Sequence, residues 1–465
     1  MSAHMNGGSA VLERAPRPSS AAPRPYQFPR FDRTALPNGL KLVIAPIPKL
    51  PIVTITALLD AGAVCDPQGR FGLAQLTADL LLEGSTSSDG TAITDRFERL
   101  GASVEAHADW DVATVTVTTL THKLRPTFEL LGEVLRVPAF NDREVERLKN
   151  ERLAELLQLR AEPRGLADEF FSSFLYESSS RYARPDGGDE ASVRGLTRDA
   201  VSGFYAKRYS PNGMTMIVAG DVRAGDIEQL ARDVLGDWKG GVPVAMTASD
   251  EAARRTRAVH IVSKSDAPQS ELRIGHVGLP RRHPDYFSAV IMNAVLGGLF
   301  SSRINLNLRE AHGYTYGASS YFDWRRQRGP WVVATAVASE VTHSAAIEVI
   351  NEIERIRSAP ITPDELSLAT SYLDGVFPIR FETTSAIAAA LTTLVVYGLP
   401  DDWYDTYREH VRAVMAADVL SAAERHLHPE ALQMVVVGSA AAVRDSVEAM
   451  AFGPVQVYDV EGRPT

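Results

Sequence analysis

Two segments decide the fold: residues 210–220, SPNGMTMIVAG, and residues 428–438, HPEALQMVVVG. Each has turn-forming residues followed by a mainly apolar run that ends in glycine, a pattern that predicts a buried strand. Each follows one helical pattern and precedes another. The two copies close the first and second halves of the chain, so the sequence indicates an internal duplication.

The first half predicts alternating strands and helices. Pro37-Asn38-Gly39 predicts a hairpin turn within residues 34–44, because Asn-Gly accepts positive φ. Strands are predicted at 53–59, 113–118 and 214–218, and helices at 73–82, 92–100, 124–135 and 142–160.

The second half repeats this plan. Residues 272–277 match the early strand, 286–297 the apolar helix and 332–338 the alternating strand. We therefore predict an α+β fold of two duplicated lobes, each a mostly antiparallel sheet packed with helices, facing each other as a clamshell.

Composition changes along the chain predict the domain boundaries. The predicted parts are a disordered tail at 1–31, a first lobe at 32–239, a linker at 240–257 and a second lobe at 258–465. The tail is rich in Pro, Ala, Ser and Arg, and the linker in Gly, Pro and small polar residues.

Composition also narrows the class of protein. The chain has 465 residues, 45% of them hydrophobic, and a formal net charge of −10, which disfavours nucleic acid as a partner. A single cysteine forms no internal disulfide, and no apolar run reaches the roughly 20 residues of a membrane span. The expected location is the cytoplasm, or the periplasm if the amino terminus is incomplete.

Several segments, in order, carry a family resemblance. They are LPNGL at 36–40, AG at 61–62, FGLAQLTADLLLEGST at 71–86, GLFSSR at 298–303 and LREAHGYTYG at 308–317. Over about residues 32–445 the chain resembles the pitrilysin or insulinase family of zinc peptidases, in its mitochondrial-processing-peptidase-like branch. The resemblance implies two metallopeptidase-like lobes around a cavity in which peptides are cut.

The zinc motif of that family is degenerate here. The family has His-x-x-Glu-His on a helix, and the resemblance places Gln75 and Asp79 at the two histidines and Ala78 at the catalytic glutamate. Glu155 corresponds to the third ligand. An amide and two carboxylates are poor zinc ligands compared with imidazoles, and no general base remains, so we expect no metal in this chain and no peptidase activity from it alone.

A second family signature is intact. Arg309 and Tyr316 keep their seven-residue spacing, and the resemblance implies that they stabilise the scissile carbonyl as negative charge develops. A structural ion pair for Arg309 and sheet packing for Tyr316 are the alternatives.

These features predict the non-zinc-binding subunit of a heterodimeric zinc peptidase. A homologous partner with intact His-x-x-Glu-His would bring the zinc, and this chain would bring Arg309 and Tyr316 to the peptide substrate. One alternative is a catalytically inactive scaffold or peptide-holding protein. Another is an unusual peptidase that binds a different metal through Asp79 and Glu155.

Two further groups carry less weight. His426 and His428 could chelate a metal by their spacing, but we interpret them as ordinary polar residues, since a third ligand is lacking in the nearby sequence. Arg325, Arg326 and Arg328 form a basic cluster that we interpret as a solvated hairpin tip rather than a carboxylate site.

Overall fold

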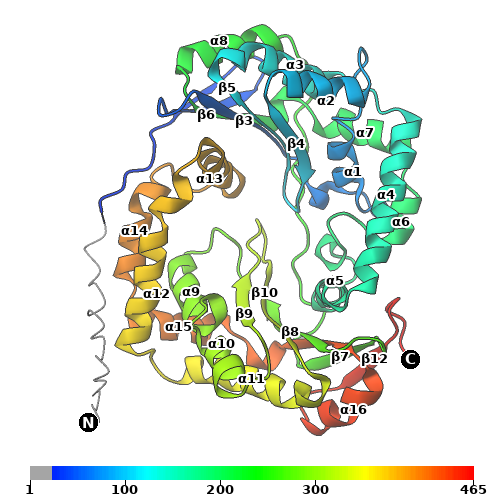
Figure 1. The fold of residues 1–465 in the computed structure, drawn as a ribbon, viewed down its shortest axis with the longest axis vertical. Coiled ribbons are helices and arrows are strands. Elements are labelled where there is room, and N and C mark those ends of the chain that lie inside the picture. Colours follow the sequence, from blue (N-terminus) through cyan, green and yellow to red (C-terminus); the bar gives the residue numbers. More distant parts are fainter. Residues whose placement is uncertain (1–23) are drawn as a thin grey trace, which may run out of the picture.

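The computed structural model describes residues 24–465, which form two lobes, each built on a six-stranded sheet (Figure 1). The first sheet has the order β1-β2-β6-β3-β5-β4, and the second has the order β12-β7-β11-β8-β10-β9. Antiparallel pairs predominate in both. The predicted α+β fold with two facing lobes is confirmed.

The first lobe contains the strands β1 (Asp32–Ala35), β2 (Lys41–Pro46), β3 (Ile52–Leu59), β4 (Ser103–Ala108), β5 (Ala113–Leu120) and β6 (Met214–Gly220). Its helices are α1 (Leu73–Asp79), α2 (Gly90–Arg99), α3 (Leu124–Arg136), α4 (Asp142–Ala161), α5 (Pro163–Leu175), α6 (Glu190–Arg194), α7 (Arg198–Arg208) and α8 (Ala224–Leu235). The predicted hairpin joins β1 to β2, and Gly39 has a φ of 90° in its turn.

The second lobe contains the strands β7 (Ala258–Ser263), β8 (Ser270–Val277), β9 (Ala318–Phe322), β10 (Pro330–Val337), β11 (Gln433–Gly438) and β12 (Val455–Tyr458). Its helices are α9 (Tyr286–Asn293), α10 (Arg303–Asn305), α11 (Thr342–Ser358), α12 (Pro363–Val376), α13 (Thr384–Tyr397), α14 (Trp403–Ala413), α15 (Ala416–His426) and α16 (Ala440–Ala449).

The duplication is visible in the strand order. β2, β6, β3, β5 and β4 of the first sheet correspond in position to β7, β11, β8, β10 and β9 of the second. The remaining edge strands differ: β1 pairs antiparallel with β2, whereas β12 pairs parallel with β7. The edge strand β1 of the first sheet is therefore the first strand of the chain, and the edge strand β12 of the second sheet is the last.

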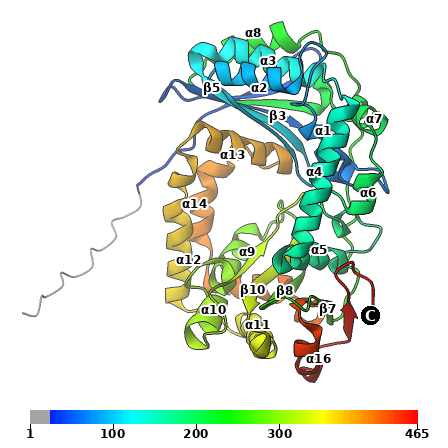
Figure 2. The same ribbon diagram turned by 45° about the vertical axis from the view of Figure 1, so that its right-hand side comes forward.

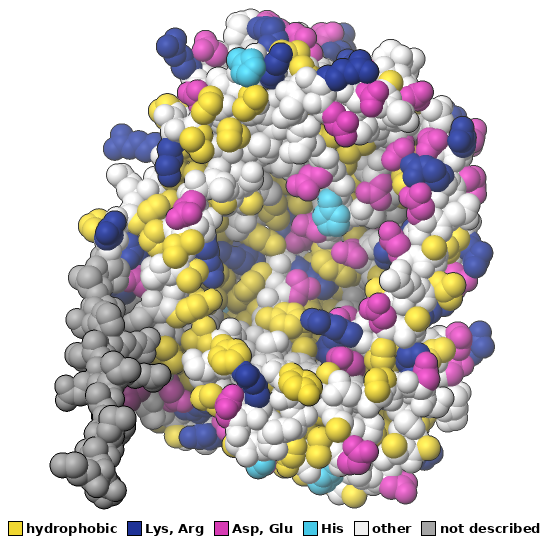
Figure 3. All heavy atoms as spheres, viewed as in Figure 1, with side chains coloured by type: hydrophobic (Ala, Val, Ile, Leu, Met, Phe, Trp, Pro, Cys, Tyr) yellow, Lys and Arg dark blue, Asp and Glu magenta, His cyan; other side chains and the backbone are white. Residues whose placement is uncertain are grey.

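One helix of each lobe packs on the sheet of the other lobe. Helix α13 of the second lobe packs on β3 and β6, and helix α5 of the first lobe packs on β8 and β11 (Figures 1 and 2). Thr54 of β3 lies 2.9 Å from Thr384 of α13 between their hydroxyl oxygens, and Arg273 of β8 pairs with Asp168 of α5 at 2.6 Å. Between the lobes the surface is hollowed (Figure 3).

At the β9–β10 hairpin tip, Arg325 is buried and Arg326 and Arg328 are partly exposed but paired with carboxylates, so the interpretation of a solvated tip is wrong. Arg325 is 3% exposed, and its guanidinium lies 4.1 Å from the ring centroid of Trp110 in the first lobe. Arg326 pairs with Asp60 at 2.7 Å. The tip is buried because it meets a first-lobe surface that offers aromatic faces and carboxylates.

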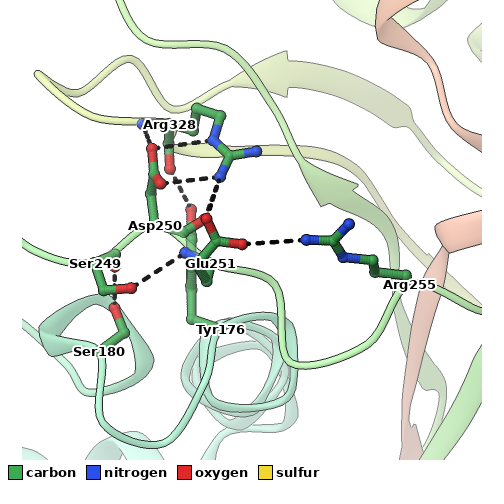
Figure 4. A network of polar contacts seen from close by, with 7 residues as sticks. All are labelled: Tyr176, Ser180, Ser249, Asp250, Glu251, Arg255 and Arg328. Carbon is green, nitrogen blue, oxygen red and sulfur yellow. Dashed lines mark hydrogen bonds and ion pairs between the residues drawn. The ribbon is translucent and has the colours of Figure 1, made fainter.

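The connection between the lobes is held by polar contacts. Residues 240–257, the predicted linker, contain no continuous helix or strand. Asp250 binds Arg328 through both carboxylate oxygens, at 2.9 and 3.0 Å, and Tyr176 donates to the Arg328 carbonyl at 2.9 Å (Figure 4). The connection, the hairpin and the first lobe thus meet at one residue, Arg328.

The predicted disordered tail needs correction at its end. Residues 1–23 lie outside the described residues, but residues 24–31 pack on the second lobe. Phe28 is buried with its ring centroid 4.7 Å from that of Tyr404, and its backbone N–H donates to Asp405 at 3.2 Å. Arg408 donates to the Arg24 carbonyl at 2.8 Å.

One helical run has the length and hydropathy of a membrane span. It covers Tyr286–Ala311, 26 residues, and half of its apolar window is buried inside the protein. Leu296, Ile304 and Leu308 belong to the second-lobe core, which accounts for the apolar composition of this run.

Candidate functional site

Helix α1 is fixed at its start by a buried ion pair. Asp66 accepts hydrogen bonds from the backbone N–H groups of Gly72 at 2.7 Å and Ala74 at 2.8 Å, which satisfies donors that the first helical turn leaves free. Arg181 pairs with Asp66 at 2.9 Å. Gly72 has a φ of 88°, in the left-handed region. The helix therefore presents residues 75–79 in a fixed orientation.

A pocket of about 420 Å³ lies beside α1, β4 and α4. Gln75, Asp79 and Glu155 all line it, so the structure brings together three of the four residues that the resemblance places at the zinc site. Ala78 is fully buried in the first-lobe core. Its methyl group supplies neither a base nor a ligand.

Gln75 is occupied by its neighbours. Its Nε2 donates to Asp79 at 2.7 Å, and its Oε1 accepts the backbone N–H of Ala108 at 3.0 Å. Gln75 thus joins α1 to the end of β4. Burial raises the pKa of Asp79 to about 6, although the hydrogen bond from Gln75 opposes this rise.

Glu155 is also paired, and it faces solvent. Its side chain is 65% exposed and binds Arg152 at 3.1 Å. Arg152 also donates to the Gly187 carbonyl at 3.1 Å, so a guanidinium cation already lies beside the acidic groups. A bound amide, a methyl group and a neighbouring cation do not fit zinc, which favours imidazole, thiolate or free carboxylate ligands.

His107 and Asp186 also belong to the polar lining of this pocket. Sequence reasoning missed both residues, because they come from β4 and from the loop after α5 and belong to no local motif. The positive charge of His107, when protonated, lowers the pKa of Asp79.

Arg309 lies in the π-helical turn Leu306–Ala311 of the second lobe, and its side chain is 34% exposed. Its guanidinium lies 4.5 Å from the ring centroid of Phe300, and its nearest carboxylate is Glu310, at 3.6 Å. Its Nη1 has no hydrogen-bond partner among the described residues. The ion pair with Glu310, which is the structural alternative for Arg309, is thus longer than a hydrogen bond.

Tyr316 is 95% exposed, in the loop that leads into β9. It does not pack in a sheet, which was the structural alternative for this residue. A tyrosine exposed to this degree offers its hydroxyl and its ring to another molecule. Arg309 and Tyr316 lie in the second lobe, whereas the pocket beside α1 lies in the first.

His426 is not paired with His428. Instead His283, Asp285 and His426 form the only group among residues 24–465 whose ligand atoms lie close enough to hold a metal ion, all within 4.8 Å. Asp285 already binds His426 at 2.6 Å and Arg425 at 2.7 Å. His428 lies near Glu430, at 3.3 Å.

Comparison with protein families gives two adjacent matches. The model described as "Insulinase (Peptidase family M16)" matches residues 42–182, and the model described as "Peptidase M16 inactive domain" matches residues 195–373.

Individual relatives agree over most of the chain. An uncharacterized zinc protease of Mycobacterium bovis is 25% identical, covering 91% of this chain and 96% of its own. The mitochondrial-processing peptidase subunit beta of Saccharomyces cerevisiae is 21% identical, covering 90% and 93%.

Among solved structures, a peptidase M16 inactive domain from Pseudomonas fluorescens has a TM-score of 0.82 and 25% identity, covering 88% of this chain and 98% of that one. A protease from Helicobacter pylori has the same TM-score at 16% identity, covering 89% and 100%, which shows the shared fold.

Proposed function

Because the chain belongs to the M16 peptidase family, we propose that it is the substrate-binding subunit of a heterodimeric zinc peptidase and binds no zinc itself. One contrast carries the proposal. The polar groups beside α1 are occupied by one another, whereas Tyr316 is 95% exposed and Arg309 keeps an unpartnered Nη1. The free groups are those that act on a substrate.

The chemical part of this chain is hydrogen-bond donation. The guanidinium of Arg309 and the phenol of Tyr316 would donate to the scissile carbonyl oxygen of a peptide as it gains negative charge. Zinc, held by a homologous partner with intact His-x-x-Glu-His, would supply the activated water. The partner's active site would then be complete only in the heterodimer.

Co-purification from the native cells tests the proposal. We expect the tagged chain to bring down a homologue with His-x-x-Glu-His, identified by mass spectrometry. A mixture of the two purified chains should hydrolyse a fluorogenic peptide, whereas each chain alone should be inactive. Zinc analysis of this chain alone should give well below one equivalent.

Hydrolysis by this chain alone, abolished by a chelator, would overturn the proposal. It would restore the alternative in which Asp79 and Glu155 hold a metal. A stable complex whose activity is unchanged by substitution of both Arg309 and Tyr316 would instead support a scaffold role.

A further inference from the structure

Among residues 24–465, a buried arginine in the second lobe lacks a counter-ion. Arg281, between β8 and α9, is 6% exposed. Its Nη1 has no hydrogen-bond partner, and no carboxylate of the described residues lies within ion-pair distance of its guanidinium. Burying an unpaired charge is costly, and neither Arg309 nor Tyr316 lines the pocket to which this arginine belongs.

Aromatic rings hold the guanidinium in place. It lies 3.8 Å from the ring centroid of Tyr286 and 5.0 Å from that of Trp403. Such cation–π contacts return part of the desolvation cost, but they use the faces of the guanidinium and leave its N–H groups free. The structure therefore holds a cation with one buried donor, Nη1, that has no hydrogen-bond partner among the described residues.

The arginine lines a pocket of about 250 Å³ between α9, α13 and α14. Trp403 also lines it, and its Nε1 is a second buried donor without a partner among the described residues. Arg380, which is exposed, adds a second positive charge. None of the described residues that line this pocket is acidic. The two buried atoms of this pocket that lack a hydrogen-bond partner among residues 24–465, Arg281 Nη1 and Trp403 Nε1, are thus both donors.

We propose that this pocket binds a carboxylate carried on an apolar group about the size of one amino-acid side chain. Arg281 and Trp403 would donate to the carboxylate oxygens, and the rings of Phe377, Tyr404 and Tyr407 would contact the apolar group. The volume lies below the roughly 300–1,000 Å³ of drug-sized sites, which limits the occupant's size. Apolar walls disfavour inorganic phosphate, whose remaining oxygens would be left without donors.

Two sources share this chemistry: a free carboxylic acid and the last residue of a peptide. Isothermal titration of the full chain with 3-phenylpropanoate and with glycyl-phenylalanine separates them. Binding of the first probe alone assigns the site to free acids, and binding of both extends it to peptide termini. The matched probes 3-phenylpropanamide and glycyl-phenylalaninamide lack the charge and should bind at least about 10-fold more weakly.

Variants locate the site. Arg281→Met should weaken binding of 3-phenylpropanoate by about 100-fold while leaving the ligand-free protein at least as thermally stable, because it removes an unpaired buried charge. Trp403→Phe keeps a ring but loses the donor, and should weaken binding about 10-fold. Arg282→Met, at an exposed neighbouring arginine, is the matched control and should leave the affinity unchanged.

Three results would overturn the proposal. They are no heat of binding for either acid at millimolar concentration, equal affinity for an acid and its amide, and unchanged affinity in a folded Arg281→Met protein. Because no peptide is cleaved in these titrations, they test this pocket separately from the proposed peptidase role.

Discussion

At the residue scale, Asp79 is a carboxylate held where its charged form is disfavoured. Its pKa is raised to about 6, chiefly by burial, against about 3.9 in an unfolded chain. Between these values the folded protein keeps a proton that the unfolded chain has lost, so this group's contribution to stability falls as pH rises from about 4 to 6.

Asp79→Asn removes the ionisation but keeps an oxygen that can accept the hydrogen bond from Gln75. We expect the variant to exceed the wild type in free energy of unfolding by about 1–3 kcal/mol at pH 7.5 and to match it at pH 4. Urea denaturation at both pH values measures this, with the exposed Asp95→Asn as control. An equal difference at both pH values would show that titration of Asp79 is not the cause.

The proposed roles of Arg309 and Tyr316 belong to the same scale, because each residue would act through its own hydrogen-bond donors. In the reconstituted heterodimer, Arg309→Ala should lower kcat for peptide hydrolysis by about 100- to 1,000-fold, and Tyr316→Phe should also lower it. The controls are Arg355→Ala and Tyr372→Phe, exposed residues of the same types on α11 and α12.

Since the side chain of Gln75 is hydrogen-bonded to Asp79 and Ala108, Gln75→Ala should change the turnover of the reconstituted heterodimer little.

At the element scale, the β9–β10 hairpin joins the lobes through its tip. Arg325 stacks on Trp110 and Tyr182 of the first lobe, at 4.1 and 4.5 Å, and pairs with Asp323 of its own hairpin. Arg325→Ala should lower the free energy of unfolding by about 2–4 kcal/mol, because it opens a cavity and leaves a carboxylate without its cation. Urea denaturation measures the loss, and the exposed Arg282→Ala should show almost none.

At the scale of the whole molecule, the chain closes on itself. Strand β1 belongs to the first sheet, yet the preceding residues pack on α14 of the second lobe. We call this path of the chain from the second lobe to the first the N-terminal crossing. Together with helices α5 and α13, which each pack on the sheet of the other lobe, it holds the lobes around the central hollow (Figures 1 and 3). A hollow fixed in this way can remain open to a peptide.

Phe28→Ala tests the packing of the N-terminal crossing on the second lobe. Its ring is buried against Phe381 and Tyr404, so we expect a loss of about 3–5 kcal/mol in free energy of unfolding. Leu50→Ala, at an exposed leucine, is the control. A loss below about 1 kcal/mol would mean that the N-terminal segment contributes little to holding the second lobe.

Local patterns in the sequence were sufficient for much of the fold. The Asn-Gly turn, the alternating strand at β5 and the repeated closing strands β6 and β11 all follow from short-range physics, and the structure confirms them. The sequence predicts a single α-helix at 286–297. In the structure the α-helical part, α9, ends at Asn293, and a π-helical turn follows it at Ala294–Gly298. The predicted lobe boundaries at 32–239 and 258–465 stay predictions.

The sequence by itself determined the duplicated α+β fold, the presence of Gln75, Ala78 and Asp79 on one helix, and the spacing of Arg309 and Tyr316. Only the tertiary structure decided which charged groups are paired, and with what. Arg325 is buried on first-lobe aromatic rings, Arg281 is buried without a counter-ion in the part of the chain that the structure describes, and Phe28 is packed rather than free. The physical reason is that burial and pairing of a side chain depend on neighbours brought from distant parts of the chain, whereas turns and periodic patterns depend on residues close in sequence.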